Sequence, residues 1–285
     1  MEISAGTVKQ LREKTGVGMM ECKSALVEAK GDIAEAEKIL RKKGLSAAAN
    51  KAGRATGEGL VAAKVDASGA TGVLVEVNCE TDFAARNADF QALVARIVDT
   101  VAAKGAATSG STADPAQAAA LAQGAGIGAM IGESVAKIGE NMQFRRYVKF
   151  VAGAGVVAFY IHTGGKIGVL VEADAKGGRT PQLDAKLRDV AMHIAAAAPR
   201  FVGRHEVSEK ALADEREIAQ AQALKAGKPP QVVEKIIQGR LEKFYGEICL
   251  LEQSFVKDPE KTVKQVLGEE ATVRRFSRFV LGEGA

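Results

Sequence analysis

The chain has 285 residues, which is enough for two or more domains that each bury a hydrophobic core. Hydrophobic residues make up 47% of the chain, and 39 basic against 35 acidic residues give a formal net charge of +4. Charges of both signs alternate along the chain, and a weakly positive surface of this kind does not identify a nucleic-acid-binding protein. No nucleic-acid partner is therefore expected.

Three cysteines lie far apart in the chain, at Cys22, Cys79 and Cys249. An odd and widely spaced set indicates neither a disulfide framework nor a zinc site, and it fits a reducing compartment. The first residues lack the basic and then apolar layout of a signal peptide. The longest weakly apolar stretch, residues 116–132, is rich in Gly and Ala and contains Gln123, so it is not expected to span a bilayer. We therefore expect a cytoplasmic protein with no membrane partner.

The first 46 residues are expected to form a bundle of three short helices. Gly16 is expected to end the first helix, and Asp32 to cap the third. The third helix is expected to end before Gly44. Residues 47–58, rich in Ala and Gly, then have the composition of a linker.

The turn between the first two helices, residues 15–20, looks like the loop of a ubiquitin-associated domain, where the turn and the residues after it form a binding surface. Met19 and Met20 have soft, adaptable side chains that suit contact with an apolar partner. Methionines fill gaps in a core more often than they bind partners, so both interpretations of these two residues stay open at this point.

An internal repeat follows the linker. Residues 59–76 and 155–172 superpose without a gap, and about half of the positions are identical. Each copy is typical of a β-hairpin, and a segment of helical periodicity follows each one, at residues 90–103 and 183–197. The fold class predicted is therefore α+β, with a duplicated core.

The two core halves are expected at residues 59–141 and 142–285. Between the hairpins, residues 104–128 are expected to be a loose connector or a partly helical excursion. Residues 133–141 resume a helical pattern, and residues 143–151 alternate as a strand that leads into the second hairpin.

A projecting antiparallel helical hairpin is expected at residues 206–245. Gly227 and Pro229 between its two helical segments suit a helix end followed by a helix start. A C-terminal strand module completes the second half. Its expected elements are a strand at 246–255, a short helix at 262–269 and a closing strand at 271–281.

Residues 78–83 (NCETDF) follow an apolar strand and precede a helix, so they are expected to form a loop at the rim of a sheet. Such loops commonly carry function. A carboxylate at Asp82 beside the aromatic Phe83 suits insertion into another protein. The alternative is that Thr81 or Asp82 caps the helix and that Phe83 belongs to the core.

Catalytic and nucleotide-binding motifs are missing from the sequence. There is no P-loop pattern, and the two glycine-rich spacings that resemble a dinucleotide loop, at 124–129 and 153–158, lack the strand-loop-helix context. His162, His193 and His205 have neither a nucleophile nor metal-ligand spacing around them. His193 is expected inside the core, whereas His162 lies at a hairpin tip, where binding and simple solvation are both open. No catalytic residue, metal or cofactor is expected.

Several separate motifs resemble the translation elongation factor Ts family. Residues 11–23 (LREKTGVGMMECK) are similar to its N-terminal signature, and residues 76–83 (EVNCETDF) to its second signature. The resemblance covers essentially the whole chain, although residues 104–132 are unusually rich in Ala and Gly. Further matches are 137–141 (KIGEN) with Arg145 and Arg146, 162–170, Gly227-Lys228-Pro229, and Arg278, Phe279, Gly282, Glu283 and Gly284.

The resemblance implies a guanine-nucleotide exchange factor for elongation factor Tu, which binds the GDP-loaded partner, displaces magnesium and promotes GDP release so that GTP can bind. It implies no covalent chemistry, no cofactor and no nucleotide bound by this chain. The bundle and the first half would engage the partner's GTPase domain, and the second half its β-barrel domain. Thr81, Asp82, Phe83 and Ala84 match the region that enters near the magnesium site. Other implied contacts are Arg12, Met19, Met20, Lys23, Ile138, Gly139 and His162.

Two other function classes compete with this one. A ubiquitin-binding-like adaptor is suggested by the bundle alone, but it leaves the duplicated core unexplained. An Ala/Gly-rich nucleotide enzyme would have to bind nucleotide by itself, and its motifs lack the required context.

Overall fold

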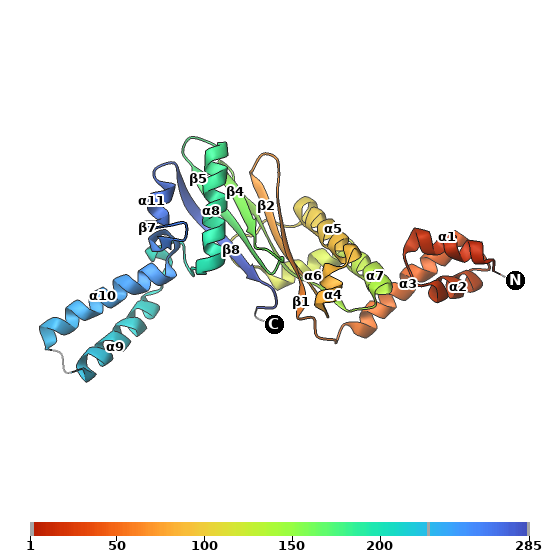
Figure 1. Ribbon diagram of the computed structural model, residues 1–285, viewed down its shortest axis with the longest axis horizontal. Coiled ribbons are helices and arrows are strands. Elements are labelled where there is room, and N and C mark those ends of the chain that lie inside the picture. Colours follow the sequence, from red (N-terminus) through yellow and green to blue (C-terminus); the bar gives the residue numbers. More distant parts are fainter. Residues whose placement is uncertain (1–2, 227–228, 284–285) are drawn as a thin grey trace.

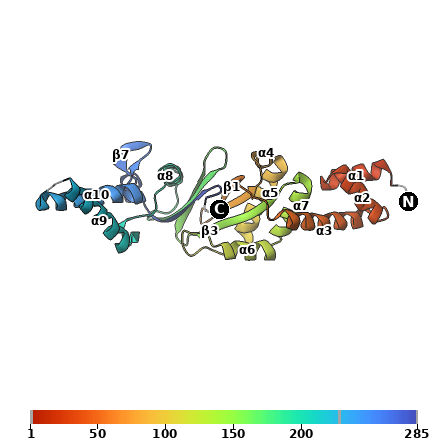
Figure 2. The ribbon, with the colours of Figure 1, turned by 90° about the horizontal axis from the view of Figure 1, so that it is seen from below.

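The computed structural model describes residues 3–226 and 229–283 (Figure 1). Gly227, Lys228 and Gly284, which belong to the family resemblance, lie outside the described residues. The molecule is elongated, with the N-terminal helices at one end and a pair of later helices at the other (Figures 1 and 2). Helices and small antiparallel sheets are mixed along the chain, which confirms the predicted α+β class.

The first three helices form a bundle whose inward faces bury Leu11, Cys22 and Leu26. Gly16 ends the first helix in the left-handed conformation, with φ 69°, as predicted. Asp32 caps the third helix by accepting a hydrogen bond from the backbone N–H of Glu35. The helices are α1 (Ala5–Thr15), α2 (Met19–Glu28) and α3 (Ile33–Lys51).

The predicted end of the third helix before Gly44 is wrong, because α3 continues to Lys51 and takes up the first part of the expected linker. Gly44 is buried inside the helix, where it faces Gly132 of a later helix. A Cβ atom at Gly44 would lie 2.8 Å from the carbonyl oxygen of Gly132. The glycine therefore permits close helix packing instead of ending the helix.

Two three-stranded antiparallel sheets form the centre, in the orders β1-β2-β3 and β4-β5-β8. The two predicted hairpins are confirmed as β1-β2 and β4-β5. The strand expected to lead into the second half is β3, and it pairs with β2 of the first half instead. The strands are β1 (Glu58–Val65), β2 (Thr71–Cys79), β3 (Met142–Val151), β4 (Gly155–Ile161), β5 (Ile167–Ala175) and β8 (Ala271–Val280).

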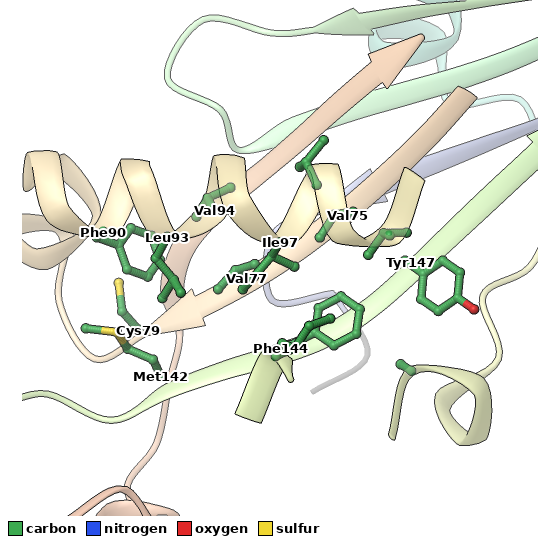
Figure 3. Packing of buried hydrophobic residues seen from close by; sticks show 14 of the residues in the cluster. Val75, Val77, Cys79, Phe90, Leu93, Val94, Ile97, Met142, Phe144 and Tyr147 are labelled. Carbon is green, nitrogen blue, oxygen red and sulfur yellow. The ribbon is translucent and has the colours of Figure 1, made fainter. Parts of the chain in front are cut away.

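The sheets pack face to face, and a long helix covers the outer face of each. Leu74 and Phe150 of the first sheet belong to the same buried cluster as Leu170 and Phe279 of the second. The covering helices are α5 (Ala88–Lys104) on the first sheet and α8 (Pro181–Ala197) on the second. Figure 3 shows the packing under α5, where Phe90, Leu93 and Ile97 meet Val75 and Val77 of β2. The resulting order of layers is helix, sheet, sheet, helix (Figure 1).

Three further helices lie beside the first sheet. Residues 104–128, expected to be a connector or partly helical, contain a helix capped by Asp114 and the start of another one. The second of these begins six residues before the predicted position at residue 133. The helices are α4 (Asp82–Arg86), α6 (Pro115–Gly124) and α7 (Ile127–Ile138).

Helices α9 (Glu209–Lys225) and α10 (Pro230–Ile248) extend away from the body (Figure 1). They pack on each other through Ala219, Ala223 and Ile237. The predicted strand at 246–255 is wrong, since α10 continues to Ile248. Ile248 packs with Val207 in a buried cluster, and short apolar runs fit a buried helix as well as a strand.

The rest of the C-terminal module is short. Strand β6 has only two residues, and the predicted helix at 262–269 is present as a five-residue helix. Its elements are the 3-10 turns Arg204–Glu206 and Leu250–Glu252, β6 (Ser254–Phe255), β7 (Asp258–Thr262) and α11 (Val263–Leu267).

Candidate functional site

The predicted loop at residues 78–83 is shorter than expected: β2 continues to Cys79 and helix α4 begins at Asp82, so only Glu80 and Thr81 connect the strand to the helix. Thr81 has an extended backbone and caps the helix, because its Oγ1 accepts a hydrogen bond of 3.2 Å from the backbone N–H of Ala84. Ala84 and Ala85 are buried in the core beneath α5. These two small side chains anchor the inner face of α4 to the body.

Phe83 points away from that anchor and is 80% exposed. The alternative in which Phe83 belongs to the core is therefore wrong. A phenyl group with this exposure on a short anchored helix is an apolar surface that suits contact with a partner. The neighbouring Ala84 is buried instead, so this short helix has one face fixed to the core and another that exposes an aromatic side chain.

Asp82 lies in the first turn of α4 and does not cap the helix. Its carboxylate forms an ion pair with Arg86, one turn later, at 2.9 Å. Both side chains are largely accessible to solvent, and exposed pairs of this kind contribute little to stability. The carboxylate can therefore exchange Arg86 for a group on a partner at small cost.

The end of α7 lies directly against the loop before α4. Thr81 donates its hydroxyl to the carboxylate of Glu140, and Asn141 donates its backbone N–H to Glu80. Ile138 is half-buried and packs against the first core, whereas Gly139 is exposed with φ 88°. The structure thus brings residues 137–141 and 80–84 together, although about 55 residues separate them.

The N-terminal turn reaches the same place. A Cβ atom at Gly16 would lie 2.9 Å from Cε of Lys137, so the turn after α1 lies against the last turn of α7. Three motifs that are distant in sequence are therefore neighbours: the turn at residues 16–18, the end of α7 and the loop before α4. Sequence spacing alone contains no signal for this arrangement.

The bundle presents apolar side chains to solvent beyond this turn. Met20 is 70% exposed and Met19 is 47% exposed, so the alternative in which they fill a core gap is wrong. Lys23 is also exposed. Val27 is exposed as well and was not among the predicted site residues, although its spacing of seven from Met20 places both on one face of α2. Arg12 of α1 is exposed too.

His162 lies at a different position, in the turn between β4 and β5. It is exposed, and its Nδ1 lies 3.1 Å from the hydroxyl of Tyr160. The same turn contacts β1, because the backbone N–H of Val61 donates to the carbonyl of Gly165 at 2.7 Å. His162 is thus held at the junction of the two sheets and not beside α4.

The buried titratable groups near the core have structural partners. His193 is buried, as predicted, and it contacts Gln253 through Nε2 at 2.9 Å and accepts the backbone N–H of Val256 at Nδ1. Burial, and secondarily the Glu140 carboxylate, raises the pKa of Cys79 to about 12. The Cys79 thiol is therefore protonated at neutral pH, and it donates to the carbonyl of Thr81.

Within residues 3–226 and 229–283, no group of three or more His, Cys, Asp or Glu side chains is arranged to hold a metal ion. No helix in the described part of the chain is long and apolar enough to cross a membrane. The site consists of exposed side chains that are available for contact with a partner, and Phe83 and Met20 are its most exposed large apolar residues.

Comparison with known proteins shows the family to which the chain belongs. The family model described as Elongation factor TS matches residues 80–283. The elongation factor Ts of Trichlorobacter lovleyi is 49% identical over all of this chain and 94% of its own length. Those of Syntrophotalea carbinolica and Clostridium botulinum are 48% and 45% identical, over 100% and 99% of this chain and 94% of their own lengths. The chain therefore belongs to the elongation factor Ts family.

Proposed function

We propose that this protein is a guanine-nucleotide exchange factor of translation elongation that acts by inserting α4 into the GTPase domain of elongation factor Tu. The observation that carries this proposal is Phe83, which is 80% exposed on a helix anchored by Ala84 and Ala85. An aromatic side chain buries on the order of 150 to 250 Å² when it finds a pocket. Phe83 has that area available for a partner.

Insertion of this kind is enough to release a nucleotide. A GTPase holds GDP through Mg²⁺ and many charged contacts with the phosphates, so a small displacement of the ligating groups weakens all of them together. Each loss of about 1.4 kcal/mol in binding free energy is a tenfold loss in nucleotide affinity. No covalent step and no catalytic base is needed, and Asp82 adds a negative charge where a cation is held.

The other contacts divide into docking and support. The exposed face of α2 with Met20, Lys23 and Val27 suits an apolar surface on the GTPase domain, and Arg12, Met19, Ile138 and Gly139 extend the same region. The second half, with His162 at its hairpin turn, would reach the β-barrel domain.

The proposal includes this division of roles and a ubiquitin-associated-like N-terminal bundle. It also includes the boundaries 1–46, 47–58, 59–141 and 142–285. A role of this protein in translation elongation implies a cytoplasmic location.

The direct test is release of fluorescent GDP from elongation factor Tu with and without this protein. We expect a large acceleration that saturates with the concentration of this protein. A release rate that is independent of its concentration would reject the proposal. The adaptor alternative is not favoured, because it gives no role to Phe83 or to the duplicated core.

A further inference from the structure

Helix α4 is too short to be stable by itself. Five residues form little more than one turn, and isolated helices of this length do not persist in water. Phe83 adds no packing inside the chain, and the buried anchors Ala84 and Ala85 have the smallest apolar side chains. A helix that has to push into a partner therefore needs support from outside itself.

Glu140 provides two hydrogen bonds to the residue that starts this helix. Its Oε2 accepts the backbone N–H of Thr81 at 3.0 Å, and its Oε1 accepts the Thr81 hydroxyl at 2.6 Å. The same hydroxyl oxygen accepts the N–H of Ala84. Because the hydroxyl proton is held by Glu140, the oxygen lone pairs remain directed at the first turn of α4. Hydrogen bonds to an ionised carboxylate are about twice as strong as those between neutral groups.

A third hydrogen bond joins the same two loops, with the donor on the side of Glu140 and the acceptor on the side of Thr81. The backbone N–H of Asn141 donates to Oε1 of Glu80 at 2.6 Å, and this contact is the main cause that lowers the pKa of Glu80. The side-chain amide of Asn141 donates to the carbonyl of Arg54 at 2.8 Å. The carbonyl of Gly139 accepts a hydrogen bond from Lys51 at 2.6 Å. The loop with Glu140 is thus fixed to the end of α3 on its other side.

We infer that Glu140 is a positioning residue for nucleotide exchange, which holds α4 in the orientation that presents Phe83 to the partner. This inference rests on the proposed function of α4. Glu140 need not touch the partner to have this effect, because it acts through Thr81. A helix that is already fixed before binding does not lose conformational freedom when it inserts, so its binding energy remains available for displacing the nucleotide contacts.

The key variant is Glu140→Gln in the full chain. Glutamine keeps the shape of the side chain but has only one acceptor oxygen, so one of the two Thr81 donors loses its acceptor whichever way the amide lies. We expect the maximal rate of GDP release to fall on the order of tenfold, as for the loss of a hydrogen bond to a charged group. The concentration of factor that gives half the maximal rate should change less than about twofold, because docking through α2 is untouched.

Matched controls separate positioning from general effects. Glu133→Gln removes a carboxylate from α7, the helix that ends just before Glu140; Glu133 pairs with Arg41 and Arg96 at the surface, and its substitution should leave the rate of GDP release unchanged. Thr81→Val removes the hydroxyl that donates to Glu140, and it should lower the maximal rate of GDP release as Glu140→Gln does. The loss of rate in the double variant Glu140→Gln with Thr81→Val should be smaller than the product of the two single losses, since the side chains of Glu140 and Thr81 share one hydrogen bond.

Hydrogen exchange provides the structural readout. The amide of Ala84 should exchange faster in Glu140→Gln, while the melting temperature stays within about 2 °C of the wild-type value. Unchanged maximal exchange activity in a variant with a loosened α4 would overturn the inference, and so would unchanged protection of Ala84. Phe83→Ala, measured in parallel, distinguishes a failure of the proposed function from a failure of the positioning role of Glu140. If that variant exchanges nucleotide normally, the proposed function fails; if it is impaired and Glu140→Gln is not, only the positioning role fails.

Discussion

Phe83 offers the sharpest test at the scale of single residues. Truncation in Phe83→Ala should cost about 2 to 4 kcal/mol at the exchange step, as for aromatic anchors of interfaces, because the phenyl group is buried only in the complex. The free energy of unfolding should hardly change. GDP release and thermal unfolding of the same variant measure the two effects.

Phe90→Ala is the matched control for this truncation. Phe90 is buried in α5, only seven residues away, and its loss should cost about 3 to 5 kcal/mol of folding stability. A large drop in melting temperature for Phe83→Ala, or unimpaired GDP release, would contradict the role of Phe83 as an inserted side chain.

His193 makes folding stability depend on pH. Burial, opposed in part by the hydrogen bond to Gln253, lowers the pKa of His193 below its ordinary value of 6.5. Between the lowered value and 6.5 the unfolded chain binds more protons than the folded chain, so folding stability falls as the pH decreases through this window. Urea unfolding at pH 7.5 and pH 5.5 should show the loss, and His193→Gln should reduce its size. The exposed His205, changed to Gln, is the control and should leave the loss unchanged.

At the scale of elements, the two sheets share one arrangement of buried charges, which links the middle strand to the third strand. Glu76 and Glu172, at equivalent repeat positions, are buried and face paired arginines, Arg145 with Arg146 and Arg274 with Arg275. In both sheets the strand register shifts directly after the glutamate. Each shift is a β-bulge that turns two successive arginines toward one carboxylate.

Removal of one such charge should be costly. Glu76 lies 3.1 Å from Arg145 and 2.6 Å from Arg146, and Glu76→Gln would leave both guanidinium groups without their counter-charge. We expect a loss of about 3 to 5 kcal/mol in the free energy of unfolding by urea. Glu269→Gln, which removes an exposed partner of Lys176, should leave the free energy of unfolding nearly unchanged. Equal effects of the two substitutions would argue against the buried cluster as a source of stability.

The contact between α3 and α7 gives another prediction at this scale. Gly44→Ala should destabilise the protein although alanine favours helices, because the added Cβ would lie 2.8 Å from a backbone carbonyl oxygen of Gly132. Gly239→Ala in α10 is the matched control, since nothing lies within 4 Å of the added atom, and it should stabilise by up to about 1 kcal/mol. Melting temperatures of the two variants should move in opposite directions. A gain for Gly44→Ala would show that α3 and α7 are less closely packed than described.

At the scale of the whole molecule, exchange requires a coupling between two binding events. The bundle of α1, α2 and α3 lies at one end of the molecule, next to the layered core that carries α4 (Figures 1 and 2). A factor that weakens the binding of GDP to its partner is itself bound more weakly by the GDP-loaded partner, and by the same factor. Calorimetry should therefore give a higher affinity for nucleotide-free elongation factor Tu than for its complex with GDP and Mg²⁺. Equal affinities would contradict the exchange mechanism.

The α+β class, the two β-hairpins and the helices after them can be predicted from local sequence patterns. These are recorded in local patterns: β-branched residues in alternation, apolar residues at helical spacing, and a repeat whose two copies have the same hydrophobic positions. The motifs at residues 11–23 and 76–83 also identified the family before any contact was known. Thr81 as a cap and His193 as a buried residue could be predicted for the same local reasons.

Which surfaces meet and which stay free depends instead on contacts between segments that are distant in the sequence. The sequence around Gly44 predicts a helix end, but the glycine lies inside α3 and packs against Gly132. Strand β3 belongs to the first sheet, where its arginines contact Glu76. The exposure of Phe83 and the support from Glu140 depend in the same way on where distant segments lie. Local patterns record the period of a segment, but the burial of one side chain depends on segments that are remote in sequence and close only after folding.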